Sequence, residues 1–205
     1  DNRPYVPFVL DQRKEGACTG FGLAAVVNFL LHNHQDQSRH PPESVSARML
    51  YEMAKRYDEW EGQAYEGSSI RGAMKGWHKH GVCTDGLWKY YPGRPGDFEP
   101  AAQLDALRRP LGSYFRVRHL HLNQMHSAIN EVGVLYASSL VHEGWNKVSR
   151  TTGRIPYRPR KIGGHAFAIV GYDQEGFWIQ NSWAGTWGLD GFGHLSYDDW
   201  LENGM

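Results

Sequence analysis

The densest run of apolar positions lies in residues 17–31, the second half of the segment DQRKEGACTGFGLAAVVNFLL. A helix on a protein surface has one apolar stripe, whereas this run is apolar on nearly all sides. It therefore predicts a buried central helix. Cys18 lies in the first turn of that helix, where unpaired backbone N–H groups and the helix dipole favour a thiolate over a thiol.

Two later segments of the first half have the periodicity of amphipathic helices. Residues 43–60 form the first, with Ser46 as the predicted N-cap, and residues 70–80 form the second, with Ser69 as N-cap and Gly81 as C-cap. A short helix is expected over residues 99–109, after an irregular stretch at 87–98. The first half of the chain is therefore predicted to be mainly helical.

The periodicity changes from helical to strand-like after Ser113. Strands are predicted over residues 114–122 and 134–141, with a helical turn at 124–131 between them. A hairpin follows, formed by 165–172 and 177–182 around a turn at 173–176. One more strand at 191–196 precedes a helix that begins at residue 197. Helices followed by strands in one chain predict an α+β fold with segregated lobes.

Composition narrows the class of protein. A chain of 205 residues can bury a substantial core as one compact unit or two small lobes. The 22 Lys and Arg residues balance the 22 Asp and Glu residues, so net charge gives no reason to expect nucleic acid or a membrane surface as a partner. No apolar run is long enough to span a bilayer, and no signal peptide is visible in these residues.

Cys18 alone is weak evidence for chemistry, because most free cysteines are small buried hydrophobic residues. The segments GGHAFAIVGY (163–172) and FWIQNSWAGTWG (177–188) change that interpretation. They place His165 on an apolar strand and Asn181 beside two tryptophans. Two antiparallel strands joined by a short turn can bring these two side chains together.

Residues of both halves match one family. They are Gln12, Gly16-Ala17-Cys18, Phe21, His165-Ala166, Asn181-Ser182-Trp183 and Trp187-Gly188. In this set and order the chain resembles the papain-like cysteine peptidases, family C1, from about Arg3 to about Trp200. The resemblance implies a two-lobe papain-like fold with the active-site cleft between the lobes. A helical lobe is expected at about 11–110, and an antiparallel β-barrel-like lobe at about 111–205 together with the N-terminal arm 1–10.

The resemblance also implies a mechanism, in which a Cys18 thiolate paired with a His165 imidazolium hydrolyses peptide bonds. Asn181 would orient the histidine, Trp183 would cover their hydrogen bond, and Gln12 would contribute to the oxyanion hole. The implied substrate-binding residues are Gly67, Ser68, Ser69, Gly164 and Trp187. A peptide or protein substrate is expected, and no cofactor or metal.

Three departures from the family pattern stand near this site. Thr19 follows the nucleophile where the family usually has Trp, Ser68 replaces the second of two glycines, and Glu15 stands where a family cysteine precedes the nucleophile by three residues. The only cysteines are Cys18 and Cys83, so a free Cys18 leaves no intramolecular disulfide. That composition favours a reducing compartment, such as the cytoplasm, or a bacterial lineage without the bridges.

Several alternatives stay open from the sequence. The domain can be a catalytically silent binding module of a larger protein, or it can transfer the acyl group to an amine instead of water. No inhibitory propeptide is recognisable, and an inhibitory segment or further domains outside these residues stay open as partners. The basic loop 143–163 is either a solvated loop or an exosite for an acidic partner. His119 and His121, spaced as on one face of a strand, are candidate metal ligands.

Overall fold

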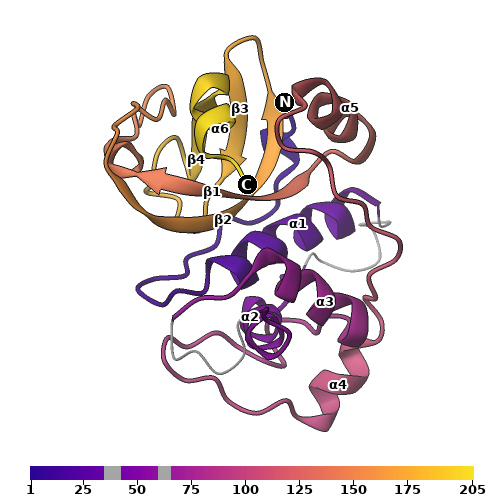
Figure 1. Ribbon diagram of the computed structural model, residues 1–205. Helices are drawn as coiled ribbons and strands as arrows, with labels where there is room; N and C mark the ends of the chain where they lie inside the picture. Colours follow the sequence, from indigo (N-terminus) through magenta and orange to yellow (C-terminus); the bar gives the residue numbers. More distant parts are fainter. Residues whose placement is uncertain (35–42, 60–65) are drawn as a thin grey trace.

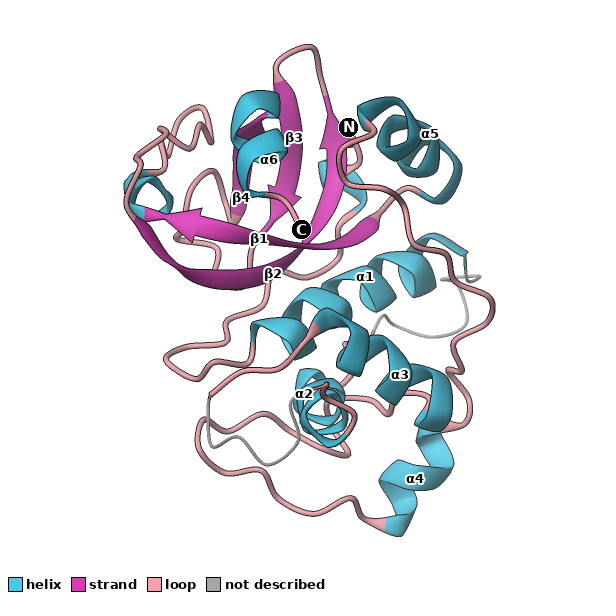
Figure 2. Ribbon diagram, in the orientation of Figure 1, coloured by secondary structure: helices cyan, strands magenta, loops and turns pink. Residues whose placement is uncertain are grey.

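The computed structural model describes residues 1–34, 43–59 and 66–205. A helical lobe and a β-sheet lobe lie against each other, and α1 (Cys18–His34) runs between them (Figure 1 and Figure 2). One hydrophobic cluster fills the helical lobe around α1, and a second lies in the sheet lobe. Among the described residues, no helix has both the length and the apolar character needed to cross a membrane.

The predicted central helix is confirmed, since Leu23 to Val27 of α1 are all buried. Two glycines allow it to pack closely on both sides. A Cβ at Gly20 would lie 2.5 Å from the Ala47 carbonyl oxygen in α2 (Ala47–Arg56), and a Cβ at Gly22 would lie 3.0 Å from the carbonyl carbon of Ala166 in the sheet. These close contacts fix the amino end of α1 between the two lobes.

The helices of the first lobe begin where their caps predict. The Ser46 hydroxyl accepts from the Met49 N–H ahead of α2, and the Ser69 hydroxyl accepts from Gly72 N–H at the start of α3 (Ile70–His80). Gly81 ends α3 with a φ of 69°, a value that favours glycine. The fourth helix, α4 (Pro100–Ala106), is followed by a turn and is shorter than predicted.

The predicted extent of α2 was wrong at its carboxyl end, because the helix stops at Arg56. Asp58 lies just beyond it, and its carboxylate accepts hydrogen bonds from the backbone N–H groups of Glu59 and Ser69. Such side-chain bonds to the backbone compete with continued helix. Residue 60, the predicted end, lies outside the described residues.

Four antiparallel strands form the sheet of the second lobe, in the order β1-β2-β3-β4. They are β1 (Leu135–His142), β2 (Lys161–Tyr172), β3 (Gly176–Gln180) and β4 (Phe192–Ser196). The hairpin of β2 and β3 is confirmed, and its turn is closed by a 3.0 Å bond from Asp173 N–H to the Gly176 carbonyl. α5 (Leu122–Val132) and α6 (Tyr197–Asn203) pack against this sheet (Figure 2).

The strand predicted at 114–122 was wrong. Residues 113–118 have no regular structure and connect the lobes, and α5 begins at Leu122. The Phe115 side chain is 87% exposed, so the apolar alternation there does not face a core. A strand needs a partner strand, and in the described part of the chain these residues pair with none.

Two short 3-10 turns and the N-terminal arm complete the second lobe. Arg3–Tyr5 forms one turn and Glu143–Lys147, called η2 below, forms the other. The arm lies on the sheet lobe, where Asn2 N–H donates to the Val170 carbonyl at 2.9 Å and the Gln180 side chain donates to the Phe8 carbonyl.

Candidate active site

Cys18 is the first residue of α1, and its thiol faces the start of the apolar part of β2. Burial raises the pKa of this thiol above its ordinary value, while the backbone N–H groups of Ala166, Thr19 and Cys18 itself act in the opposite direction. The contact with the Ala166 N–H locates the Cys18 thiol in the fold, because Ala166 directly follows His165. The thiol and the imidazole therefore occupy the same small region between the lobes.

His165 and Asn181 are brought together by the β2–β3 hairpin. Asn181 is the first residue after β3, and its Oδ1 lies 2.7 Å from Nε2 of His165. The Ser182 backbone N–H donates to the same oxygen at 2.7 Å, which fixes the orientation of the amide. Because a carbonyl oxygen only accepts, His165 carries a proton on Nε2 and leaves Nδ1 for another partner.

Both side chains are buried, His165 at 5% exposure and Asn181 at 2%. Burial lowers the pKa of His165 to about 4, although the hydrogen bond to Asn181 acts to raise it. Burial therefore opposes a charged imidazole at this position just as it opposes a charged thiol at Cys18. A close pair of opposite charges would offset both penalties together.

Tryptophan rings cover the histidine. The centres of the Trp183 and His165 rings lie 4.9 Å apart. The ring of Trp145, in η2, meets the His165 ring in an edge-to-face arrangement, with 5.8 Å between the ring centres. Trp187 packs on both tryptophans and donates from Nε1 to the Trp145 carbonyl at 2.8 Å. This aromatic wall excludes water from the His165–Asn181 hydrogen bond, which strengthens the bond.

Gln12 is buried and held on three sides. Its side-chain oxygen accepts from the Ser182 hydroxyl at 2.7 Å, and its Nε2 donates to the Glu15 carbonyl at 3.0 Å. Its own carbonyl accepts from the Tyr90 hydroxyl at 2.6 Å. Since an amide nitrogen has two N–H groups, one N–H of Gln12 has no partner among the described residues and is available to a ligand.

The loop at residues 66–69 lies against the same end of α1. Ser68 and Thr19 share a hydrogen bond between their hydroxyls at 2.6 Å, and the Gly67 N–H donates to the Tyr51 hydroxyl at 3.3 Å. A Cβ at Gly16 would already be 3.3 Å from this loop. Two departures from the family pattern, Thr19 and Ser68, are thus partners of each other beside Cys18.

The remaining candidates lie around the same site. Gly164 is exposed, and a Cβ placed on it would meet no atom within 4 Å, so the chain just before His165 borders open space. Trp187 is half-buried in the aromatic wall. Sequence reasoning missed Trp145, Ser182 and Tyr90 as supports of the site. Ser182 lies inside the recognised Asn-Ser-Trp run, whereas Trp145 lies in a loop with no distinguishing pattern.

No group of three potential metal ligands is present among residues 1–34, 43–59 and 66–205. The strand on which His119 and His121 were expected to share a face is absent, because His119 lies in a turn and His121 stands at the N-cap position of α5, without a side-chain capping bond. The spacing argument for a metal at that place therefore fails.

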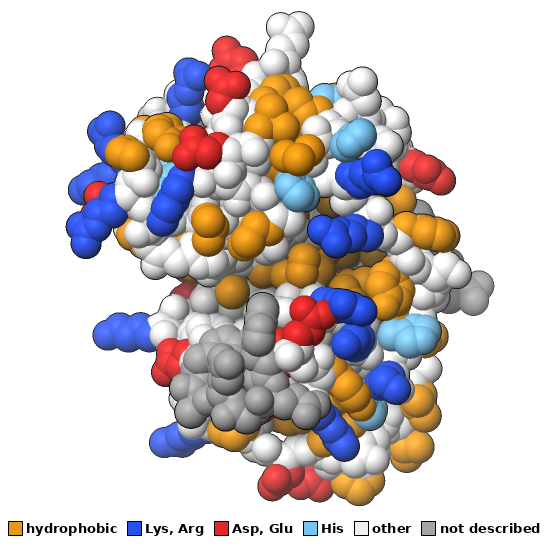
Figure 3. Space-filling model, viewed as in Figure 1, with side chains coloured by type: hydrophobic (Ala, Val, Ile, Leu, Met, Phe, Trp, Pro, Cys, Tyr) orange, Lys and Arg blue, Asp and Glu red, His pale blue; other side chains and the backbone are white. Residues whose placement is uncertain are grey.

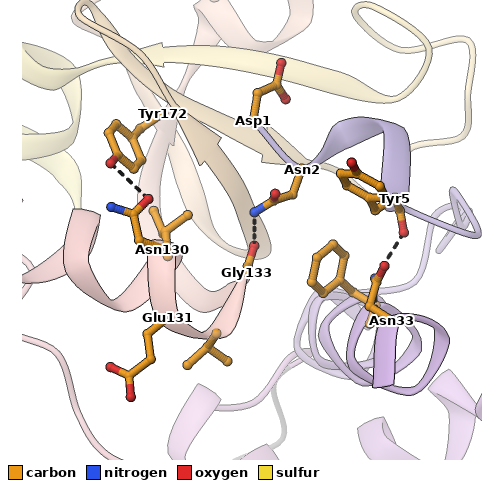
Figure 4. A pocket seen from close by; sticks show the side chains of 11 residues that line it. Asp1, Asn2, Tyr5, Asn33, Asn130, Glu131, Gly133 and Tyr172 are labelled. Atoms are coloured by element: carbon orange, nitrogen blue, oxygen red, sulfur yellow. Dashed lines mark hydrogen bonds between the residues drawn. The ribbon is translucent and has the colours of Figure 1, made fainter. Parts of the chain in front are cut away.

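Two surface features lie outside the site. A hollow of about 540 Å3 is lined by the N-terminal arm, α5 and the far end of α1, including Phe29 and Asn33, and is thus remote from Cys18 (Figure 4). The basic side chains of the 143–163 loop gather at one edge of the sheet lobe (Figure 3). Three of them form exposed ion pairs, namely Arg154 with Glu175, Arg160 with Glu143 and Lys161 with Glu202.

A two-lobed α+β fold that places a cysteine at the first position of a central helix, beside a buried His–Asn pair, defines the papain-like class of cysteine protease folds. The sequence profile of the papain family cysteine proteases matches residues 1–203. The chain therefore belongs to that family.

Individual relatives agree with the family assignment. An uncharacterised peptidase C1-like protein of Acanthamoeba polyphaga mimivirus is 25% identical over 202 residues, a match that covers 92% of this chain and 64% of that protein. The chain thus spans less than two thirds of the length of this relative. Xylellain, a cysteine protease from Xylella fastidiosa, has a similar structure, with a TM-score of 0.84 and 26% identity, covering 97% of this chain and 81% of xylellain.

A digestive procathepsin L 3 of Tenebrio molitor shares the fold at a TM-score of 0.70 and 18% identity. The match covers 94% of this chain and 61% of that one. At this level of identity the likeness concerns the fold alone.

Proposed function

We propose that this protein is a cysteine endopeptidase that hydrolyses peptide bonds through an acyl-enzyme on Cys18. The observation that carries the proposal is the buried 2.7 Å hydrogen bond between Asn181 and His165, whose neighbour Ala166 in β2 contacts the Cys18 thiol. A nucleophile, a base and a group that orients the base are the parts that thiol-dependent acyl transfer needs.

In the proposed reaction the Cys18 thiolate attacks the carbonyl carbon of the scissile peptide bond. The electron pair of the carbonyl moves onto its oxygen, and when it returns the C–N bond breaks. The His165 imidazolium gives its Nδ1 proton to the leaving amine. His165, now neutral, then takes a proton from water as the hydroxide attacks the thioester, and the thiolate leaves to regenerate the starting pair.

Asn181 holds the histidine for both proton transfers. Its oxygen accepts from Nε2, so that Nδ1 stays directed toward the thiol and the substrate. The tautomer and the ring orientation are thereby set before substrate binds. Trp183 and Trp145 keep water from competing for the same hydrogen bond.

The oxyanion of the tetrahedral intermediate is proposed to lie between the Cys18 backbone N–H and the free N–H of Gln12. Gln12 is pre-oriented by Ser182 and Glu15, so its donor needs little reorganisation during the reaction. Loss of one such donor typically lowers kcat by about 100- to 1000-fold.

The substrate is proposed to be a peptide segment bound in an extended conformation along residues 67–69, with Gly164 and Trp187 bordering the leaving-group side. Backbone groups on an exposed loop bind an extended peptide by main-chain hydrogen bonds. Ser68, which is hydrogen-bonded to Thr19, has a larger side chain than the glycine of the family pattern, so we expect a narrower substrate groove beside residues 67–69.

The test is turnover of a mixture of fluorogenic peptides with varied side chains ahead of the scissile bond. Wild-type protein and the Cys83→Ser variant should cleave at the same rate, and Cys18→Ser should show none above background while keeping the same circular dichroism spectrum. Retention of activity in Cys18→Ser would refute the assignment. Release of product only when an amine is added would instead favour acyl transfer.

A further inference from the structure

Arg48, in α2, is a completely buried cation next to the candidate oxyanion hole. Its side chain is 0% exposed and lies on the ring of Tyr90, with the guanidinium carbon 4.6 Å from the ring centre. Both Glu15 oxygens accept from it, at 2.9 and 2.7 Å, and Glu52 accepts at 2.9 Å. Its remaining hydrogen bond goes to the Tyr91 carbonyl.

The Glu15 carboxylate is held mainly by Arg48. Besides Arg48, its carboxylate accepts from the Gly93 backbone N–H at 3.2 Å. Burial opposes its ionisation, but the hydrogen bonds and charge of Arg48 outweigh burial, and the pKa of Glu15 lies below its ordinary value. The pair therefore stays charged at neutral pH. A bidentate Arg–carboxylate pair has a fixed geometry, which a single contact does not have.

The Glu15 backbone leads directly to Gln12. The Glu15 carbonyl accepts the 3.0 Å hydrogen bond from Gln12 Nε2. Tyr90, whose ring stacks against Arg48, donates from its hydroxyl to the Gln12 carbonyl at 2.6 Å. Arg48 is thus linked to both ends of Gln12, through Glu15 at the side chain and through Tyr90 at the backbone. No disulfide holds this loop, since Cys18 and Cys83 are both free.

We propose that Arg48 is a positioning residue for catalysis, which holds the 12–15 loop through Glu15 so that the free amide N–H of Gln12 is aimed at the oxyanion. The inference rests on the proposed function, because it assigns Gln12 to the oxyanion hole. It extends that function to a side chain that touches neither the substrate nor the reacting atoms. A shift of about 1 Å in a group that binds a transition state can cost about 100-fold in rate.

The test is a double-mutant cycle on kcat with Arg48→Lys and Gln12→Ala. Lysine keeps the charge but cannot form the planar two-point pair that the guanidinium makes with Glu15. In the wild-type background Arg48→Lys should lower kcat by about 10- to 100-fold with KM little changed, because only transition-state binding is lost. In the Gln12→Ala background the same substitution should lower kcat by less than about 3-fold, since there is no amide left to position.

A matched control comes from the same lobe. Arg109 also forms a partly buried pair with a carboxylate, Asp105, at 2.8 Å, and it lies far along the chain from Gln12. Arg109→Lys should reduce stability without a selective loss in kcat. Equal losses for Arg48→Lys in both Gln12 backgrounds, or a loss in Arg109→Lys as large as in Arg48→Lys, would overturn the proposal.

Two further measurements keep the test decisive. If Arg48→Lys does not fold, Glu15→Gln replaces it in the cycle, because it keeps the shape of the side chain and removes one acceptor oxygen facing Arg48. The NMR signal of the Gln12 side-chain amide, identified by its loss in Gln12→Ala, should shift and exchange faster in the Arg48 or Glu15 variant. That signal reports positioning even if wild-type protein cleaves no peptide, so failure of the proposed function and failure of this inference are separable.

Discussion

Asn181→Ala removes the oxygen that accepts from His165 and leaves the rest of the site in place. Asn181 Oδ1 is the acceptor 2.7 Å from His165 Nε2, and Asn181 Nδ2 has no hydrogen-bond partner among the described residues. The substitution therefore removes the hydrogen bond with the His165 side chain, and it removes no hydrogen-bond donor that has a partner. The Ser182 N–H also loses its acceptor.

The magnitude follows from the charge on His165 during catalysis. A buried hydrogen bond to a charged group contributes about 1.5–3 kcal/mol. At about 1.4 kcal/mol per factor of ten, its loss lowers the population of the imidazolium, and with it kcat/KM, by about 10- to 150-fold. The hydrogen bond that His165 donates to Asn181 raises the pKa of His165, so its loss should move the acidic limb of the pH–rate profile, expected near pH 4 in the wild type, further toward acid.

Asn181→Asp is the matched control, because it keeps an oxygen facing Nε2 and adds a negative charge beside it. A nearby carboxylate favours the charged imidazole, so this variant should keep most of the activity and move the acidic limb upward. The assay is kcat/KM for one fluorogenic peptide between pH 3.5 and 9 for the three proteins. If Asn181→Ala stays within about 2-fold of wild type with an unchanged acidic limb, Asn181 does not orient His165.

Two further predictions concern stability. Gly20→Ala should lower the free energy of unfolding by at least about 1–3 kcal/mol, since the added Cβ would lie 2.5 Å from the Ala47 carbonyl oxygen, while Gly185→Ala, with no atom within 4 Å of its Cβ, should be nearly neutral. Urea unfolding measures both, and equal midpoints would contradict the close packing of α1 on α2. The folded protein should also gain stability as pH rises from about 4 to 6.5, because the Cys18–His165 pair holds a single proton in the folded protein, whereas the thiol and the imidazole together hold two protons in this range when unfolded. That difference is worth about 3 kcal/mol, and His165→Asn should show a correspondingly weaker pH dependence.

Local chemistry explains what was predictable from the sequence. Ser46, Ser69 and Gly81 act on backbone groups within a few residues of themselves, so the starts of α2 and α3 and the end of α3 were predicted correctly. The β2–β3 hairpin was predicted because its turn and both strands are contiguous. His165 and Asn181 meet as a direct consequence of that hairpin.

What the sequence did not predict depends on contacts between distant segments. The residues at 114–122 have the alternation of a strand but find no partner in the described part of the chain. Arg48 has the sequence context of an ordinary helix residue, and its burial becomes apparent only when Glu15 is placed beside it. Trp145 likewise reaches His165 from a loop whose sequence gives no sign of the contact.

The central claim is that Cys18 and His165 share one proton as a thiolate and an imidazolium. Burial raises the pKa of the Cys18 thiol and lowers the pKa of His165 to about 4. These two shifts define a wide pH range in which the pair holds a single proton. They do not decide which partner holds it, because the neutral pair and the ion pair contain the same number of protons.

The most direct measurement is therefore the rate of Cys18 alkylation by iodoacetamide from pH 5 to 8, read by peptide mass mapping. Cys83, whose pKa burial and the nearby Asp105 raise to about 11, is the internal reference in the same protein. An ion pair predicts a Cys18 rate that is fast at pH 5 and nearly constant to pH 8, and a His165→Ala variant that loses this reactivity. A Cys18 rate that rises about tenfold per pH unit, in parallel with an ordinary thiol, would contradict the account.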